Sequence, residues 1–255
     1  MERFGSPSRR LVMRLSVAVQ LLDDLTGMPV RGSNARVWIE GQRPPIKKDD
    51  GRRVFVDLPA GEYVLKAEGG FYSRTELECK VSDGRTEYVT IRLTPNAQYP
   101  VPDDIVRIEG KADPGLEIKV FPSDRGSAYK LLSEAEKGSD VLGIYHSGGE
   151  NIEGKLLKII SSDDKSEYFR IMSAAEGDRS EYLLSGKLGS GYPKIGTIIV
   201  PVSECTADEK GNFVILIKRG AGRELTAEYN SKGKKKYTQK TIDISGSNNI
   251  NLDLT

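Results

Sequence analysis

The sequence of 255 residues has little of what most metal sites, disulfide frameworks and membrane spans are built from. It contains one histidine, two cysteines and no apolar run long enough for a transmembrane helix. Cys79 and Cys205 are too few and too far apart for the framework of a small secreted domain. Cys79 shares a predicted strand face with Leu77 and Val81, so we expect it to be a buried core residue.

The chain also lacks an excess of charge of either sign. Its 38 basic and 37 acidic side chains leave a net charge of +1. A dedicated nucleic-acid binder needs a clear basic excess on one face, so this class is not expected. With 37% hydrophobic and 29% charged residues, the composition is that of a globular protein.

The N-terminus has basic residues before an apolar stretch, but it lacks the other marks of a signal peptide. Arg14 and Gln20 interrupt LVMRLSVAVQLL, and no small-residue cleavage site follows. We therefore expect cytoplasmic synthesis without a signal peptide, no membrane insertion, and a flexible segment at residues 1–10.

Motifs for catalysis and cofactor binding are missing as well. His146 has no cysteine, histidine or carboxylate at ligand spacing, and is interpreted as a surface histidine beside a loop. There is no GxSxG elbow, phosphate loop or dinucleotide-binding motif. Acidic pairs such as Asp23-Asp24 lack the alternation of a calcium loop. The sequence predicts no catalytic residue, no metal site and no cofactor, and hence a protein that is not an enzyme.

What the chain does have is β-strand patterning. Leu77, Cys79 and Val81 alternate with polar residues, as do Val89, Ile91 and Leu93, with a Ser-Asp-Gly turn between the two runs. Turn signals recur about every ten residues. This spacing favours an all-β fold of sandwich or barrel type.

A proline-rich link divides the strands into two sets. Three prolines in PNAQYPVP remove backbone donors and stiffen the chain. We expect two immunoglobulin-like or transthyretin-like β-sandwiches in tandem. The predicted parts are a first sandwich at 11–94, a linker at 95–102, and a second sandwich at 103–255 with an insert at about 123–195.

The insert is the least clearly patterned part. AYKLLSEAEK fits either a short helix or a strand that leads into a turn, whereas YFRIM and EYLLSGKL have the pattern of strands. An extra hairpin or a small subdomain is the expectation.

Residues 13 to 93 resemble the carboxypeptidase-regulatory-like, or transthyretin-like, β-sandwich. The resemblance rests on LLDDLTGMPVRGSNARVWIEG and on KKDDGRRVFVDLPAGEYVLKAEGGFY. With the linker and IRLTPNAQYPVPDDIVRIEGKA, the chain also resembles tandem sandwiches that accompany phage-tail-like contractile injection systems. This second resemblance implies a role in assembly, as a component of a baseplate, tail or cap.

Two functions follow from the sequence. The first is a non-enzymatic structural or adaptor protein whose partners are other subunits of a large assembly. Lys234, Lys235 and Lys236, at a predicted hairpin tip, are its candidate partner-binding residues. A lysine–asparagine isopeptide bond within the second sandwich is a weaker option, with Lys111 or Lys119 as the nucleophile and Asn249 or Asn251 as its partner.

The alternative function is a β-sandwich module that binds carbohydrate or a cell surface. Sandwiches bind such ligands through exposed aromatic side chains. The candidates are Tyr72, Tyr129, Tyr145 and Tyr192.

Overall fold

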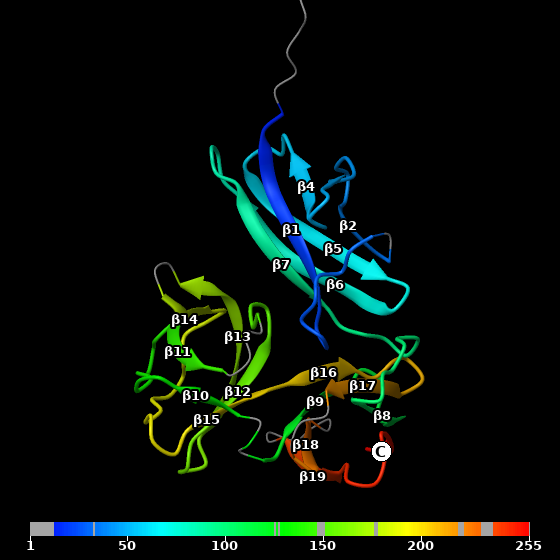
Figure 1. Ribbon diagram of the computed structural model, residues 1–255, viewed down its shortest axis with the longest axis vertical. Helices are drawn as coiled ribbons and strands as arrows, with labels where there is room; N and C mark the ends of the chain where they lie inside the picture. Colours follow the sequence, from blue (N-terminus) through cyan, green and yellow to red (C-terminus); the bar gives the residue numbers. More distant parts are fainter. Residues whose placement is uncertain are drawn as a thin grey trace, which may run out of the picture.

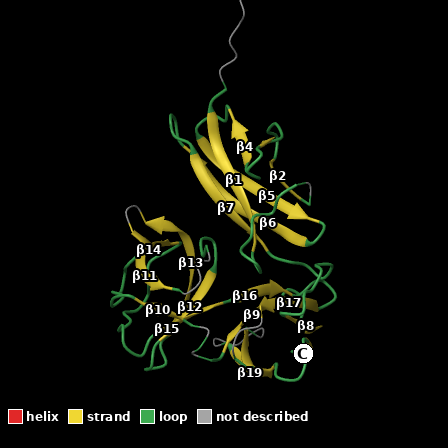
Figure 2. Cartoon of the chain, viewed as in Figure 1, coloured by secondary structure: helices red, strands yellow, loops and turns green. Residues whose placement is uncertain are grey.

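The computed structural model describes residues 13–32, 34–124, 126, 128–146, 151–175, 178–218, 222–230 and 237–254. These residues form strands, turns and loops without a helix (Figure 2). The predicted all-β fold is confirmed. The segment 1–10, expected to be flexible, and the three candidate lysines Lys234, Lys235 and Lys236 lie outside the described residues.

The first β-sandwich packs a four-stranded sheet of order β3-β4-β1-β7 against a three-stranded sheet of order β2-β5-β6. Its strands are β1 (Leu15–Asp23), β2 (Ala35–Ile39), β3 (Ile46–Lys47), β4 (Arg53–Val56), β5 (Gly61–Gly69), β6 (Tyr72–Val81) and β7 (Glu87–Leu93). Strand β1 lies between β4 and a parallel β7, and this central position explains its nearly continuous apolar sequence.

The second β-sandwich consists of a sheet of order β16-β9-β18-β19 and a sheet of order β17-β8-β20. Its strands are β8 (Ile105–Lys111), β9 (Glu117–Pro122), β16 (Ser203–Thr206), β17 (Asn212–Lys218), β18 (Glu224–Tyr229), β19 (Thr238–Asp243) and β20 (Asn249–Asp253). The chain leaves this sandwich after β9 and returns to it at β16, so everything between is an insertion.

The insert is a closed six-stranded barrel of order β10-β11-β14-β13-β12-β15, and thus more than a hairpin. Its strands are β10 (Tyr129–Leu131), β11 (Val141–Tyr145), β12 (Leu156–Ile160), β13 (Ser166–Ala175), β14 (Asp178–Leu184) and β15 (Ile198–Pro201). AYKLLSEAEK forms the short β10 and then a turn, so the predicted alternative of a strand that leads into a turn is confirmed. Figure 1 shows the first sandwich above, with the barrel and the second sandwich below it.

Each body has its own hydrophobic core. Phe55, Leu65 and Leu93 belong to that of the first sandwich. Cys79 is 8% exposed and lies in the same core, which confirms its predicted burial. The second sandwich and the barrel have separate cores of similar size, and a small fourth cluster around Phe121 lies where these two bodies meet.

The LPAGEY segment closes the first sandwich by a specific contact. The Tyr63 hydroxyl donates to the carbonyl of Pro59 at 2.9 Å, and the backbone N–H of Leu58 donates to Ser16 Oγ at 3.0 Å. The turn is thereby tied to its own strand and to β1.

Candidate functional site at the junction of the three bodies

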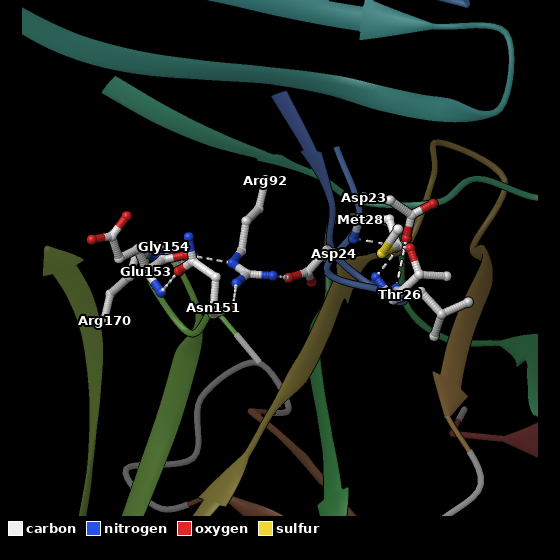
Figure 3. Close-up of polar contacts among 10 residues, drawn as sticks. Asp23, Asp24, Thr26, Met28, Arg92, Asn151, Glu153, Gly154 and Arg170 are labelled. Atoms are coloured by element: carbon white, nitrogen blue, oxygen red, sulfur yellow. Dashed lines mark hydrogen bonds and ion pairs between the residues drawn. The ribbon is translucent and has the colours of Figure 1, made fainter. Parts of the chain in front are cut away.

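Arg92 is the residue that joins the first sandwich to the barrel. It stands near the end of β7 on the face opposite the core, yet its side chain is only 4% exposed. The guanidinium donates to the backbone carbonyls of Asn151 and Glu153 and pairs with Asp24 Oδ1 at 3.4 Å (Figure 3). A planar fork of donors suits several acceptors at once, which an ammonium does not match.

The barrel loop that receives Arg92 has the shape this contact requires. Gly154 follows the two acceptor carbonyls and has a φ of +77°, and a Cβ there would meet Arg92 Cγ and Cδ at 3.3 Å. The Asn151 side chain accepts the N–H of Glu153 at 2.8 Å and fixes the turn. Residues of the loop itself, Asn151 and Gly154, therefore favour the conformation that accepts Arg92.

Arg170 on β13 holds the same loop from the other side. It donates to the Gly154 carbonyl at 2.8 Å and to Glu204 Oε1 on β16 at 2.6 Å. The loop is thus pinned by one arginine from the first sandwich and by one that also contacts the second sandwich.

The proline-rich link is fastened as well, through Asp23 at the end of β1. Its Oδ2 accepts the hydroxyls of Tyr72, at 2.9 Å, and of Tyr99 in the link, at 2.6 Å. Its Oδ1 accepts the N–H groups of Leu25 and Thr26. Burial, followed by the hydrogen bond to the carboxylate, raises the pKa of both tyrosines, so both remain donors at physiological pH.

The barrel and the second sandwich meet at a buried ion pair. Lys158 Nζ on β12 lies 2.5 Å from Glu228 Oε1 on β18, and the two side chains are 5% and 3% exposed. Glu228 also accepts hydrogen bonds from Tyr168 and Gln239. Burial acts to raise the pKa of Glu228, but the hydrogen bonds, that of Lys158 first, outweigh it and leave the pKa below its usual value.

The three bodies enclose a cleft of about 790 Å³ between them. Most of its charged side chains are already paired, as in Arg170 with Glu204 and Arg74 with Glu76. The one aromatic residue in its lining is the buried Phe213. Burial raises the pKa of the Cys205 thiol, which lines the cleft, to about 12, so this thiol is not a nucleophile at neutral pH.

The residues that the sequence singled out do not gather at this junction. Of the four candidate tyrosines, Tyr192 is buried, Tyr72 donates to Asp23, and Tyr129 packs against the barrel core and the His146 ring. Tyr145, at 56% exposure, is the one with an open ring. His146 is half-buried, and its Nε2 lies 2.9 Å from the hydroxyl of Tyr182, so it is not the surface residue expected.

The isopeptide option finds no support in the contacts. Lys119 lies between Glu117 and Glu204 on the sheet that contains β9. Lys111, on β8, is opposite Asp253, and its Nζ donates to the Lys210 carbonyl. Asn249 and Asn251 are opposite Arg107 and Glu109.

Two residues that matter in the structure were missed in the sequence. Arg92 has the alternation of an exposed strand residue, and nothing local reveals that the barrel covers it. Trp38, the single tryptophan, stands on the outer face of β2. Its alternation with Val37 and Ile39 was a usable signal. Across the described ranges, no group of three or more histidine, cysteine or acidic side chains is placed to hold a metal ion, and no helix there could cross a membrane.

Comparisons with known proteins add little about function. No family model matches the chain, and no curated protein matches its sequence. Among solved structures, the chain is similar to the Bacillus anthracis TIE protein, with 10% identity over 93% of this chain and a TM-score of 0.27. It spans 50% of the length of that protein.

Two further solved structures are similar over most of their length. One is a candidate carbohydrate binding protein from Bacteroides uniformis (13% identity, 89% of this chain, 98% of that chain, TM-score 0.26). The other is the shaft pilin SpaA of Lactobacillus rhamnosus GG (11% identity, 94% and 96%, TM-score 0.24). All three scores lie below 0.5, so these likenesses carry no argument about function.

Proposed function

We propose that the protein is a non-enzymatic structural or adaptor subunit that holds three β-bodies in a fixed arrangement within a larger assembly. The observation that carries the proposal is the buried Arg92 of the first sandwich, whose guanidinium donates to backbone carbonyls of the barrel loop 151–154. A freely hinged tandem would leave this guanidinium in water.

The contacts beside Arg92 support the same role. Tyr99 fastens the link to the first sandwich, and Arg107 Nη1 donates to the Ala97 carbonyl from the second sandwich at 3.2 Å. The link is therefore held from both ends. Most charges in the cleft between the bodies are paired, and the groups described above include no activated nucleophile, which suits a spacer better than an enzyme.

The more specific form of the proposal is a component of a phage-tail-like contractile particle, as a baseplate, tail or cap subunit. Its support is the sequence resemblance of the LPAGEY sandwich and the PNAQYPVP link. The carbohydrate-binding or cell-surface-binding module is the second candidate, and the observation that favours it is the half-buried Trp38 on the outer face of β2.

Sedimentation of lysate from cells that encode the protein tests the structural role. We expect the chain in a fast-sedimenting fraction, and mass spectrometry of that fraction to find sheath and tube proteins. If it sediments only as a free chain, the structural role is wrong. If it sediments in a particle without sheath or tube proteins, the contractile form alone is wrong.

A further inference from the structure

The outer face of the sheet β2-β5-β6 presents the only tryptophan of the chain. Val37 and Ile39 point into the core at 4% and 5% exposure, so Trp38 between them points outward. It stands opposite Lys66 on β5, which in turn stands opposite Glu76 on β6. The ring therefore lies on a flat, three-stranded surface of long polar side chains.

Two guanidinium groups flank the ring. Arg36 Cζ lies 4.8 Å from the ring centroid and Arg74 Cζ 5.7 Å from it. Both lie within the range of a cation–π contact. Contacts of this kind fix the orientation of the indole, which is half-buried.

The charges around Trp38 cancel in pairs. Arg36 donates to Glu68, Arg74 donates to Glu76, and Lys66 donates to Glu40 at 2.9 Å. Glu40 also accepts the indole N–H at 3.3 Å. An anionic ligand would meet three carboxylates here and a cationic one three cations. The ligand that suits this surface is uncharged.

A hollow of about 430 Å³ lies on the same face of the sheet, and its lining includes Glu68 and the two arginines that flank the ring, Arg36 and Arg74. Its floor depends on Gly69, because a Cβ there would lie 2.2 Å from the backbone oxygen of Asn34. Gly70 beside it has open space around its Cβ direction and no positive φ. The volume lies within the range of small-ligand sites, roughly 300–1,000 Å³.

We propose that the Trp38 ring and this hollow bind a neutral oligosaccharide. A sugar ring offers an apolar C–H face to an aromatic platform, and its hydroxyls each donate and accept. The adjacent arginine and glutamate of the hollow supply donors and acceptors side by side. The inference rests on the second candidate function, the carbohydrate-binding module, and is independent of the assembly role, since either can fail while the other holds.

Trp38 is its own reporter, because no other tryptophan contributes to the emission. The probes are linear tetra- to hexasaccharides of glucose, mannose, galactose or N-acetylglucosamine, with sulfated and uronate oligosaccharides as a charged set. We expect a saturable change in Trp38 emission with at least one neutral probe. If no neutral probe changes it, or if only charged probes do, the proposal is wrong.

A blocking variant separates the hollow from the general surface. Gly70→Leu places a side chain in the hollow without a backbone clash and should weaken binding at least tenfold. Gly186→Leu, at an equally open glycine of the barrel, is the matched control and should bind like the wild type. Equal binding by the two variants would overturn the proposal.

A second variant covers the case in which Gly70→Leu folds poorly. Arg36→Gln removes the guanidinium that faces both ring and hollow while it keeps a polar chain, and calorimetry with the best neutral probe should show at least a tenfold loss. If the surface pairs serve only the stability of the sheet, Arg36→Gln leaves binding unchanged, and the site is refuted.

Discussion

The two junctions of the barrel are built differently. Toward the second sandwich the barrel has the Lys158–Glu228 pair, the apolar cluster around Phe121, and two chain crossings. Toward the first sandwich it has chiefly Arg92, which binds backbone carbonyls and one partly exposed carboxylate. The barrel and second sandwich thus share a buried interface, whereas among the described residues the contact between the first sandwich and the barrel centres on the Arg92 side chain.

The largest effect is expected from Glu228→Ala at the buried junction. The change leaves Lys158 charged and without its carboxylate, and breaking a buried pair in this way costs about 3–5 kcal/mol. Urea unfolding followed by circular dichroism should show the loss, whereas the Trp38 emission, which reports the first sandwich, should keep its midpoint. An equal decrease of the urea midpoint measured by circular dichroism and by Trp38 emission would contradict the division into two junctions.

A double variant supplies the control for that experiment. Lys158→Met with Glu228→Leu replaces both charges by apolar groups, which is often nearly neutral or stabilising. We expect it to recover most of the stability lost in Glu228→Ala. If it stays as unstable as the single variant, the pair is not the source of the loss.

Arg92→Ala should have the next largest effect, at the junction between the first sandwich and the barrel. It leaves the backbone carbonyls of Asn151 and Glu153 without the guanidinium from which they accept, and each acceptor left unpaired costs about 1–3 kcal/mol. Small-angle scattering should show a larger radius of gyration while circular dichroism keeps the strand signal. Arg92→Lys should be intermediate, since an ammonium keeps the charge and loses the fork.

An exposed arginine provides the comparison for Arg92. Arg14 pairs with Asp83 at 3.4 Å, and its side chain is 46% exposed. Exposed pairs of this kind contribute about 0–1 kcal/mol. Arg14→Ala should therefore leave the scattering profile unchanged, and a change equal to that of Arg92→Ala would argue against a special role for the junction.

Acid should act on the buried junction more weakly than the substitutions do. The folded-state pKa of Glu228 lies below its unfolded value, so the stability it contributes is complete above the unfolded pKa of about 4.5 and is lost as the pH falls through the folded one. A pH series of urea midpoints should show this decline in the wild type and a flatter profile in the double variant. Matching profiles would contradict the assignment.

The contrast between the junctions also explains what could be read in the sequence. Alternation along β6 and β7 is a local signal, so the strands and the burial of Cys79 were predictable. Lys158 and Glu228 are 70 positions apart, and Arg92 and Glu153 are 61 apart. Contacts of that range depend on how the barrel closes, which no local period encodes.

Trp38 differs from these long-range contacts, because its place on the outer face of the sheet could be predicted from the sequence. It alternates with Val37 and Ile39, and the arginine two positions before it lies on the same face. The candidate tyrosines were chosen by residue type alone. Tyr192 does not offer an open ring to a ligand, because it lies in the barrel core. The hydroxyl of Tyr72 donates to Asp23.

The smallest effect is expected from Asp24→Asn. The sign of the change in stability tests how the first sandwich is held to the barrel. Burial raises the pKa of Asp24, and Arg92 only partly opposes this. Because the folded pKa lies above the unfolded one, ionisation of Asp24 lowers the stability of the folded protein as the pH rises. The variant with the neutral amide should therefore be slightly more stable than the wild type at pH 7. At pH 3 the two proteins should be equally stable. Urea midpoints from Trp38 emission at the two pH values measure this difference. A lower stability of Asp24→Asn at pH 7 would mean that the ion pair, and not only the two carbonyl contacts, holds Arg92 in place.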